Sequence, residues 1–506
     1  MPSTLTRRQF LRSAGGVTFL ALTPVGRGLF AAVADTLAPM PLFTALPYIQ
    51  PGPDGRLVPG KEIVRLAWQT EPKGATFTVE FGPDDHYGHT ATITRTQRDF
   101  GKDFDPPGRF NYIGAFEGLA LRTQYHYRVR CNGTDLMKGF FTTRQPRGSH
   151  IRFAAFGDNG CALQANRVIA HRVHQSHPDF IMNAGDNVYD CGRDEEYRRY
   201  FFPVYNADTS ALDVGGPVMR SVPYYTVLAN HDLNAEEPEN KLPVAHAGYF
   251  PDLLAYYTNF HFPLNGPEPT YPTSICGPAN RIDNFKACAG PRFPRMANYS
   301  FDCGDAHFLC LDANTYVDPT DEALQRWIAE DLAATDAIWK LVVYHHPAFT
   351  VGNGHYSEQH MRALAPLFEQ QGVDLVIAGH EHGYQRNMPF RFAPRDLTKA
   401  HAVRTSDRFI PGTFTLDTKF DGVTQTRPDG VLYITTGAGG QSLHDADMTN
   451  RPARWLHHED DHVAYCSRLI ADRNSFSIIE IEGAELSWVQ IDELGQEIDR
   501  FRVTKT

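Results

Sequence analysis

The sequence lacks several features that would each indicate a particular class of protein. No run or stripe of basic residues occurs, and 59 acidic residues outnumber 48 lysines and arginines, which disfavours nucleic acid as a partner. Behind the N-terminal region, no segment reaches the about 20 continuous apolar residues that a stable membrane span needs. No Cys-x-x-Cys pair occurs, so zinc bound by cysteine is not expected. No Gly-x-Ser-x-Gly motif marks a serine nucleophile.

The N-terminus carries the pattern of an export signal. It shows, in order, a charged start, a short apolar run and small residues at a cleavage site: Arg7-Arg8 with Phe10-Leu11, Ala14 to Leu22, and Ala32-Val33-Ala34. This pattern resembles a twin-arginine signal, and the start of a basic amphipathic helix is the alternative. We therefore expect residues 1–34 to be a signal peptide and the protein to be periplasmic or extracellular.

The eight cysteines are even in number and would meet an oxidising compartment after export. Cys276 with Cys288, in a loop rich in proline, glycine and asparagine, is the first candidate for a disulfide, and Cys161 with Cys191 is the second. Buried thiols are the alternative for all of them, because spacing does not fix the connectivity.

At 506 residues the chain exceeds what one hydrophobic core usually serves. Alternating apolar segments such as Ile63–Trp68 and Gln124–Arg130 predict a supporting β-sandwich over residues 35–145. From Ile151 onward, apolar strands end in polar loops and are followed by helical stretches, which predicts an α/β or α+β domain over residues 150–506. Residues 235–298, rich in Pro, Tyr and Asn, are predicted to be an irregular insertion.

Five polar loops of the second domain each follow a predicted strand. Open sheets place ligands at this end of their strands, so we expect the five loops to meet. Alone, each loop is a weak indication, because a Gly-Asp pair is usually a turn and a lone histidine is usually a core residue. Together they form an ordered set: Gly157-Asp158-Asn159-Gly160, Gly185-Asp186-Asn187-Val188-Tyr189, Asn230-His231-Asp232, His345-His346-Pro347 and Gly379-His380-Glu381-His382.

This set resembles the motifs of the calcineurin-like metallophosphoesterases and, among them, of the purple acid phosphatases: GDxG, GDxxY, GNH(E/D), VxxH and GHxH. Ala229 departs from the first glycine of the third motif. Gly160 stands where most metallophosphoesterases have a histidine ligand, and Tyr189 would supply the missing donor. The resemblance implies a fibronectin-III-like β-sandwich followed by a four-layer αββα metallophosphoesterase domain.

The resemblance also implies seven metal ligands. Asp158, Tyr189 and His382 would bind one metal, Asn230, His345 and His380 would bind the other, and Asp186 would bridge them. Anionic oxygen donors suit Fe(III), whereas imidazoles and an amide suit a divalent Fe, Zn or Mn ion. For Tyr189 alone, a hydrogen-bonded core tyrosine is the alternative.

By the same resemblance, hydroxide held by the metals would attack a phosphomonoester of a small molecule. His231 is predicted to contact substrate and to be the general acid, with Asp232 as its orienting partner. His355 is predicted to bind substrate, but Gly354 occupies a neighbouring position where the family has a second histidine. Other polar residues, His346, Glu381, His444, His457 and His458, are weaker candidates for the pocket, and solvated loops are the simpler interpretation of the last three.

Two other functions stay open at this point. The same chemistry serves a phosphodiesterase or a phospholipase-like hydrolase, which the sequence separates poorly from a phosphomonoesterase. A non-catalytic surface protein that only binds phosphate or metal is the alternative of a different class. All seven ligand positions are filled, which favours an enzyme, since function follows the site rather than the fold. The sequence leaves the oligomeric state open.

Overall fold

The computed structural model describes residues 43–72, 75–98, 109–233, 245–246, 253–268, 275–276, 278–352, 355–400, 408–444 and 464–505. All of them belong to one unit, Leu42–Thr506. The expected export signal, Gly354 and the pair His457-His458 lie outside the described residues.

The first described segment forms two four-stranded antiparallel sheets. One contains β1 (Phe43–Pro51), β2 (Glu62–Thr70), β6 (Arg109–Leu119) and β5 (Thr92–Arg98), and the other contains β4 (His89–Thr90), β3 (Phe77–Gly82), β7 (Gln124–Cys131) and β8 (Thr134–Thr142). Alternate residues face a shared apolar core that includes Trp68, Phe116 and Phe141. The region is therefore β-rich as expected, while its fibronectin-like identity and the boundary near residue 145 stay predictions.

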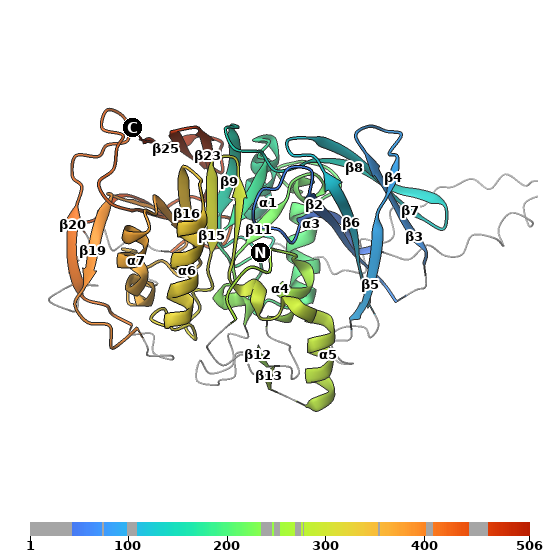
Figure 1. The fold of residues 1–506 in the computed structure, drawn as a ribbon, viewed down its shortest axis with the longest axis horizontal. Helices are drawn as coiled ribbons and strands as arrows, with labels where there is room; N and C mark the ends of the chain where they lie inside the picture. Colours follow the sequence, from blue (N-terminus) through green and yellow to red (C-terminus); the bar gives the residue numbers. More distant parts are fainter. Residues whose placement is uncertain are drawn as a thin grey trace, which may run out of the picture. The chain divides into compact units, whose positions relative to one another are not determined.

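Two larger sheets form the rest of the unit (Figure 1). The six-stranded sheet has the order β11 (Tyr224–Thr226), β10 (Phe180–Asn183), β9 (Ile151–Phe156), β23 (Ser475–Glu482), β24 (Glu485–Asp492) and β25 (Glu497–Thr504). The seven-stranded sheet has the order β14 (Tyr299–Cys303), β15 (Ala306–Cys310), β16 (Trp339–Val343), β17 (Leu375–Ala378), β21 (Leu432–Thr436), β18 (Tyr384–Asn387) and β22 (Cys466–Ile470). Strand β9 begins at Ile151, where the sequence predicts the first apolar strand of this domain.

The two large sheets share one apolar core. The ring of Phe308 on β15 meets that of Phe153 on β9 edge to face at 5.2 Å between centroids. Helix α1 (Gln164–Gln175) contacts β23 of the six-stranded sheet. Helices α6 (Glu322–Ala334) and α7 (Ala365–Gln370) lie beside the seven-stranded sheet (Figure 1). The side chain of Asp321 begins α6 by accepting the backbone N–H groups of the first turn.

The segment predicted to be an irregular insertion is partly helical. Helix α4 (Leu254–Asn259) is buried along its length, and helix α5 (Ala279–Ala289) follows it. The apolar side chains that pack α4 against the main core include Tyr256 and Tyr257. The prediction from proline and tyrosine content missed these helices, because burial of aromatic side chains overrides weak helix propensity.

The remaining elements of the described residues are short. They are α2 (Asp194–Glu196), the π-helical turn Tyr197–Phe201, α3 (Phe202–Tyr205), β12 (Ala245–His246), β13 (Ile275–Cys276), β19 (Phe390–Pro394), β20 (Gly412–Leu416) and five 3-10 turns, Val218–Arg220, Asn230–Asp232, Gly290–Arg292, Arg295–Ala297 and His360–Leu364.

The second candidate disulfide is wrong. Cys161 carries a free thiol, and its sulfur lies 3.2 Å from Oε1 of Gln441, so it is not bonded to Cys191. The side chain of Cys276 lies outside the described residues, so its pairing with Cys288 stays a prediction.

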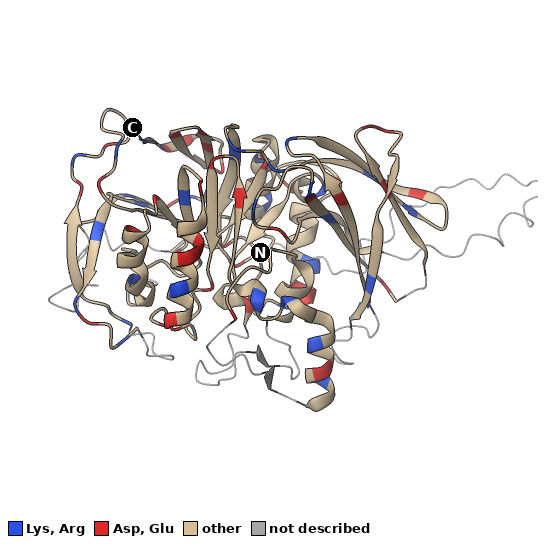
Figure 2. Cartoon of the chain, viewed as in Figure 1, with Lys and Arg blue, Asp and Glu red and all other residues tan. Residues whose placement is uncertain are grey.

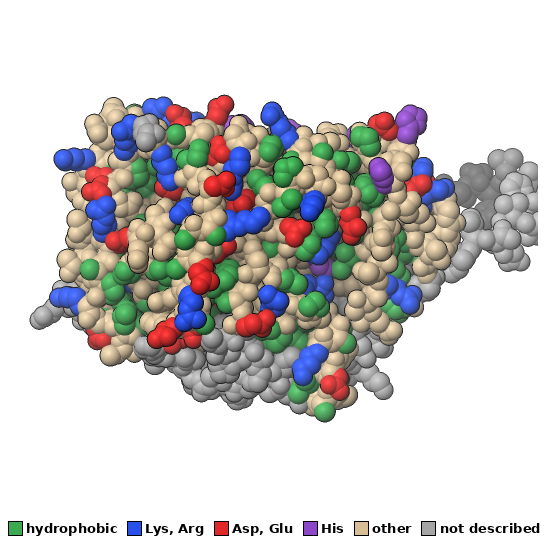
Figure 3. Space-filling view, viewed as in Figure 1, with side chains coloured by type: hydrophobic (Ala, Val, Ile, Leu, Met, Phe, Trp, Pro, Cys, Tyr) green, Lys and Arg blue, Asp and Glu red, His purple; other side chains and the backbone are tan. Residues whose placement is uncertain are grey.

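Charged residues of both signs are distributed over the described elements (Figure 2). On the face shown in Figure 3, acidic and basic side chains alternate without a large area of one sign. Among the helices that the structure describes, none is long and apolar enough to cross a membrane.

Candidate metal centre

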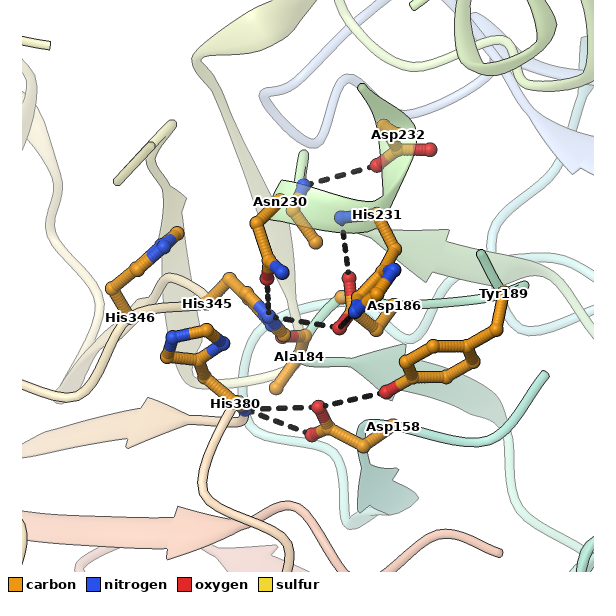
Figure 4. Close-up of polar contacts among 12 residues, drawn as sticks. Asp158, Ala184, Asp186, Tyr189, Asn230, His231, Asp232, His345, His346 and His380 are labelled. Carbon is orange, nitrogen blue, oxygen red and sulfur yellow. Dashed lines mark hydrogen bonds and ion pairs between the residues drawn. The ribbon is translucent and has the colours of Figure 1, made fainter. Parts of the chain in front are cut away.

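Three loops from each large sheet meet at the carboxyl ends of parallel strands. Strands β9, β10 and β11 lead into Asp158, Asp186 and Asn230, and β16 and β17 lead into His345 and the histidines that follow. Strand β21 contributes the third loop of its sheet, residues 437–444. Most of these side chains face one another in Figure 4. The prediction that the loops lie close together at this end of the strands is therefore confirmed.

The backbone turns sharply at three of the predicted ligands. Asp158, Asp186 and His380 have φ values of 60°, 49° and 68°, each directly after a glycine. This left-handed conformation is uncommon for residues with a Cβ atom and is typical of functional sites. Gly379 allows the close approach, because a Cβ atom there would lie 2.7 Å from Oδ2 of Asp158.

The ring of His345 is fixed by a main-chain acceptor. Its Nδ1 lies 2.7 Å from the carbonyl oxygen of Ala184 and therefore carries the proton. Its Nε2 faces only oxygens, with Oδ1 of Asn230 at 2.9 Å and Oδ2 of Asp186 at 3.3 Å. A neutral ring would point its lone pair at the lone pairs of both oxygens. The arrangement is satisfied only when a positive charge lies among these atoms.

The ring of His382 is also fixed by a main-chain acceptor. Nδ1 of His382 lies 2.6 Å from the carbonyl oxygen of Ser442, which directs Nε2 toward Asp158 at 3.4 Å. The hydroxyl of Tyr189 lies 3.2 Å from Oδ1 of Asp158 and 3.3 Å from Nε2 of His382. Carboxylate, phenol and imidazole therefore converge at a point separate from the His345 group.

The third imidazole is held by a residue that the sequence analysis missed. Nε2 of His380 lies 2.9 Å from Oε2 of Glu358. Burial, together with the neighbouring His355, lowers the pKa of His380 to about 4, so the ring is neutral and donates its Nε2–H. This leaves the Nδ1 lone pair available. Glu358 lies 13 residues after His345 in no recognisable motif, so only its contact marks it.

Asp186 lies between the two groups. Its Oδ1 accepts the backbone N–H of His231 at 3.1 Å, and its Oδ2 faces His345. Burial opposes its ionisation, but His345 and His231 hold the pKa of Asp186 well below its usual range. One ligand atom each of Asp186, His345 and His380 lies within 4.8 Å of the others. This position fits the bridging role predicted for Asp186, which stays a prediction.

The two buried carboxylates make positive charge favourable at the centre. Burial opposes protonation of His345, yet Asp186 raises its pKa to about 9. The buried Tyr189 is a neutral phenol in the absence of a metal, because burial and then Asp186 and Asp158 raise its pKa well above 10.0. A phenolate forms here only when positive charge offsets the two carboxylates. The donor set and its lone pairs therefore fit bound metal ions.

Gly160 explains why a tyrosine takes the place of the histidine. A Cβ atom at position 160 would lie 1.7 Å from the carbonyl oxygen of Asn187 and 2.2 Å from Cα of Val188. The loop that carries Tyr189 thus packs directly on Gly160, in space that a side chain would need. A histidine does not fit at position 160 while Tyr189 occupies its present place.

The orienting role expected for Asp232 is wrong. Its carboxylate accepts the backbone N–H of Ala229 at 3.0 Å and the hydroxyl of Tyr197 at 3.2 Å, and it points away from the centre (Figure 4). The carbonyl oxygen of Asp190 instead lies 2.7 Å from Nδ1 of His231. The 3-10 turn Asn230–Asp232 decides this, because it directs the Asp232 side chain back to cap its own backbone. Burial raises the pKa of Asp232 to about 7.

The two residues with predicted substrate roles lie at the margin of the centre. His231 packs against Tyr189 with ring centroids 4.2 Å apart, and its Nε2 lies 3.9 Å from Oδ2 of Asp186. His355 stacks on His380 at 3.5 Å between centroids. Both side chains keep about a fifth to a quarter of their surface exposed, 22% and 24%. The roles of His231 and His355 stay predictions.

The weaker candidates separate into two kinds. The side chains of His346 and Glu381 are buried. His444 is not a freely solvated loop residue, because its ring stacks on His382 at 4.0 Å between centroids. No sequence motif marks this contact, since a loop from a different strand brings His444 to the site.

Comparison with known proteins agrees with this geometry. The sequence pattern of the family described as calcineurin-like phosphoesterase matches residues 151–384. Purple acid phosphatase 23 of Arabidopsis thaliana is 32% identical over 366 residues, which cover 67% of this chain and 64% of that protein. Purple acid phosphatase 15 of the same plant is 25% identical over 368 residues, which cover 65% and 59%. The chain thus matches less than two thirds of the length of these relatives.

The fold has a counterpart among solved structures. A purple acid phosphatase from yellow lupin (Lupinus luteus) seeds superposes with a TM-score of 0.62 at 16% identity, over 90% of this chain and 74% of that one. The relationship to purple acid phosphatases implies a binuclear metal centre, and the paired groups around Asp158 and Asp186 are candidates for it. Residues 151–384 therefore form a calcineurin-like phosphoesterase domain, and the chain is similar to purple acid phosphatases.

Proposed function

We propose that this protein is an exported binuclear metallophosphatase that hydrolyses phosphomonoesters. The observation that carries the proposal is the convergence of imidazole lone pairs on two buried carboxylates. Backbone carbonyls hold the Nδ1 protons of His345 and His382, so both Nε2 atoms face Asp186 or Asp158. A structural histidine is normally satisfied at both nitrogens, whereas this arrangement is typical of metal ligands.

The donor types support two unlike metals. Asp158, Tyr189 and His382 would hold Fe(III), because carboxylate and phenolate oxygens are hard anionic donors. Asn230, His345 and His380 would hold a divalent Fe, Zn or Mn ion, with Asp186 shared between the two. When bound, such a metal pair supplies Lewis acidity toward phosphoryl oxygens and a water-derived nucleophile near neutral pH.

The chain's own residues would supply the proton and the orientation. The Nδ1–H of His231 donates to the carbonyl oxygen of Asp190, which fixes the ring and leaves Nε2 toward Asp186 and the centre. From this position Nε2 of the imidazolium form would give its proton to the leaving alkoxide. His355, which stacks on His380 and is 24% exposed, would hold the phosphoryl group.

Metal analysis with a visible spectrum tests the centre, and substrate comparison tests the reaction. We expect about two metals per chain, one of them iron, with a visible charge-transfer band, and faster turnover of p-nitrophenyl phosphate than of its bis-ester. Faster turnover of the bis-ester would make the protein a phosphodiesterase. A metal-loaded protein without activity on any phosphoester would leave only the non-catalytic function.

The export proposal rests on the sequence at Arg7 and Arg8. Replacing both by lysine keeps their charge but removes the paired arginines of a twin-arginine signal. We expect the wild type in the periplasmic or extracellular fraction and the double variant in the cytoplasmic fraction. Export of both to the same extent would contradict the assignment.

A further inference from the structure

Each histidine of the Gly379–His382 loop that we assign to a metal is covered by another imidazole. The ring of His355 lies on that of His380 with centroids 3.5 Å apart, and the ring of His444 lies on that of His382 with centroids 4.0 Å apart and planes within 14°. The two covering rings are 5.4 Å apart. They come from different loops, since His355 follows β16 and His444 follows β21.

A glutamate holds Nδ1 of each covering ring. Nδ1 of His355 lies 3.4 Å from Oε1 of Glu358, and Nδ1 of His444 lies 2.9 Å from Oε1 of Glu381. Glu381 also accepts the backbone N–H of His355 at 3.1 Å, so one buried carboxylate ties both loops together. The two rings are therefore held on fixed supports rather than on free loops.

The Nε2 atom of each covering ring is available to a ligand. Within the described ranges, Nε2 of neither His355 nor His444 has a hydrogen-bond partner, although Nδ1 of each ring has one. Their side chains are 24% and 25% exposed, in contrast to the buried His345 and His346. Two fixed imidazoles thus keep one unused nitrogen each, beside the two candidate metal positions.

We propose that His444 binds substrate and that His444 and His355 together clamp the phosphoryl group of a phosphomonoester. The proposal rests on the phosphatase function proposed above. A monoester dianion carries one more unesterified oxygen than a diester, and this oxygen accepts hydrogen bonds from the Nε2–H groups of the two rings in their imidazolium form. The clamp therefore favours monoesters over diesters.

A third metal ion at His355, Glu381 and His444 is the competing interpretation, because these residues offer ligand atoms within 4.8 Å of one another. The same atoms, however, are already engaged. Nδ1 of His444 contacts both Glu381 and the backbone N–H of His382, and the second carboxylate oxygen accepts the N–H of His355. His355, Glu381 and His444 therefore form a hydrogen-bonded support, and the metal content of the variants distinguishes this support from a third metal site.

The test compares His444→Ala and His355→Ala with the control His86→Ala, an exposed histidine of the β-rich region. For the metal-loaded full chain, we would measure metals per chain, inorganic phosphate binding by calorimetry, and kcat and KM for p-nitrophenyl phosphate and its bis-ester. We expect His444→Ala to weaken phosphate binding and to raise the monoester KM about tenfold, the effect of losing one hydrogen bond to a charged group. The diester KM should change less than about twofold, and the metal content should stay the same.

Several results would overturn the clamp. These are unchanged phosphate binding in His444→Ala, an equal rise of KM for both esters, or the loss of one metal ion per chain, the last of which would establish the third metal site. Phosphate binding does not depend on turnover. A wild-type protein that binds phosphate in a His444-dependent manner but hydrolyses nothing would refute the proposed function and retain the clamp's binding role.

Discussion

Oε2 of Glu358 lies 2.9 Å from Nε2 of His380, on the ring nitrogen that is not needed for a metal. This contact fixes which nitrogen of His380 carries the proton and so keeps the Nδ1 lone pair available. Carboxylates in this position orient histidine ligands and increase their basicity.

Replacing Glu358 by alanine should therefore weaken metal binding. We expect Glu358→Ala to lower metal affinity about 10- to 100-fold, and Glu358→Gln, whose amide oxygen still accepts the proton, to keep most of it. Metal content after dialysis against graded chelator concentrations measures the difference. Equal retention by the alanine variant and the wild type would show that Glu358 does not position His380.

His231 should matter most for substrates with poor leaving groups. His231→Ala removes the proposed proton donor, so we expect turnover of phenyl phosphate to fall by about 100-fold or more and that of p-nitrophenyl phosphate to fall less. Steady-state rates for a series of aryl phosphates measure this, with His86→Ala as the control. An equal loss across the series would argue for a binding role alone.

Tyr189 should be the source of any visible colour. Tyr189→Phe removes the phenol oxygen that lies 3.2 Å from Asp158, so a tyrosinate-to-iron band should disappear. The control is Tyr125→Phe, whose hydroxyl accepts a backbone N–H in the β-rich region and should leave the spectrum unchanged. Persistence of the band in Tyr189→Phe would remove this residue from the ligand set.

Gly160 should not tolerate a side chain. Because its Cβ would lie 1.7 Å from the carbonyl oxygen of Asn187, we expect Gly160→Ala to destabilise the protein by about 1–3 kcal/mol and to lower metal content. Gly160→His should do the same rather than add a ligand. Gly114→Ala is the matched control, because its nearest contacts would be at 3.7 Å. Denaturant unfolding and metal analysis measure both effects, and a stable Gly160→His protein with full metal content would contradict the steric argument.

A buried ion cluster remote from the metals should give a pH-dependent stability. Nδ1 of His307 lies 2.7 Å from Asp302 and its Nε2 lies 2.8 Å from Asp331. Burial opposes the charge, but both carboxylates raise the pKa of His307. Its stabilising contribution is therefore complete below the unfolded pKa of about 6.5 and is lost as pH rises through the higher folded pKa.

His307→Gln should accordingly destabilise the protein most at mildly acidic pH. At pH values near 6 we expect a loss on the order of 3 kcal/mol, which diminishes toward alkaline pH. Asp302 stays ionised at this pH, because His307 and Arg147 overcome the effect of burial and lower its pKa. Unfolding curves of wild type and variant at several pH values provide the measurement. A difference that is constant with pH would show that His307 acts through packing only.

The sequence by itself determined the strands and the order of the candidate ligand loops. Asp158, Asp186, Asn230, His345 and the pair His380 and His382 each follow a run of apolar residues, and that local pattern is enough to place them at strand ends. The departure at Gly160 was also visible as a missing donor. Such features depend on neighbours along the chain, which a single sequence displays directly.

Only the tertiary structure decided which groups support those ligands. Glu358 reaches His380, and His444 reaches His382, across loops from different strands, and no periodicity connects such residues. The side chain of Asp232 follows its local 3-10 turn instead of its sequence neighbour His231. Contacts between distant segments form when two sheets pack, so they depend on the packed arrangement and leave no pattern within any one segment.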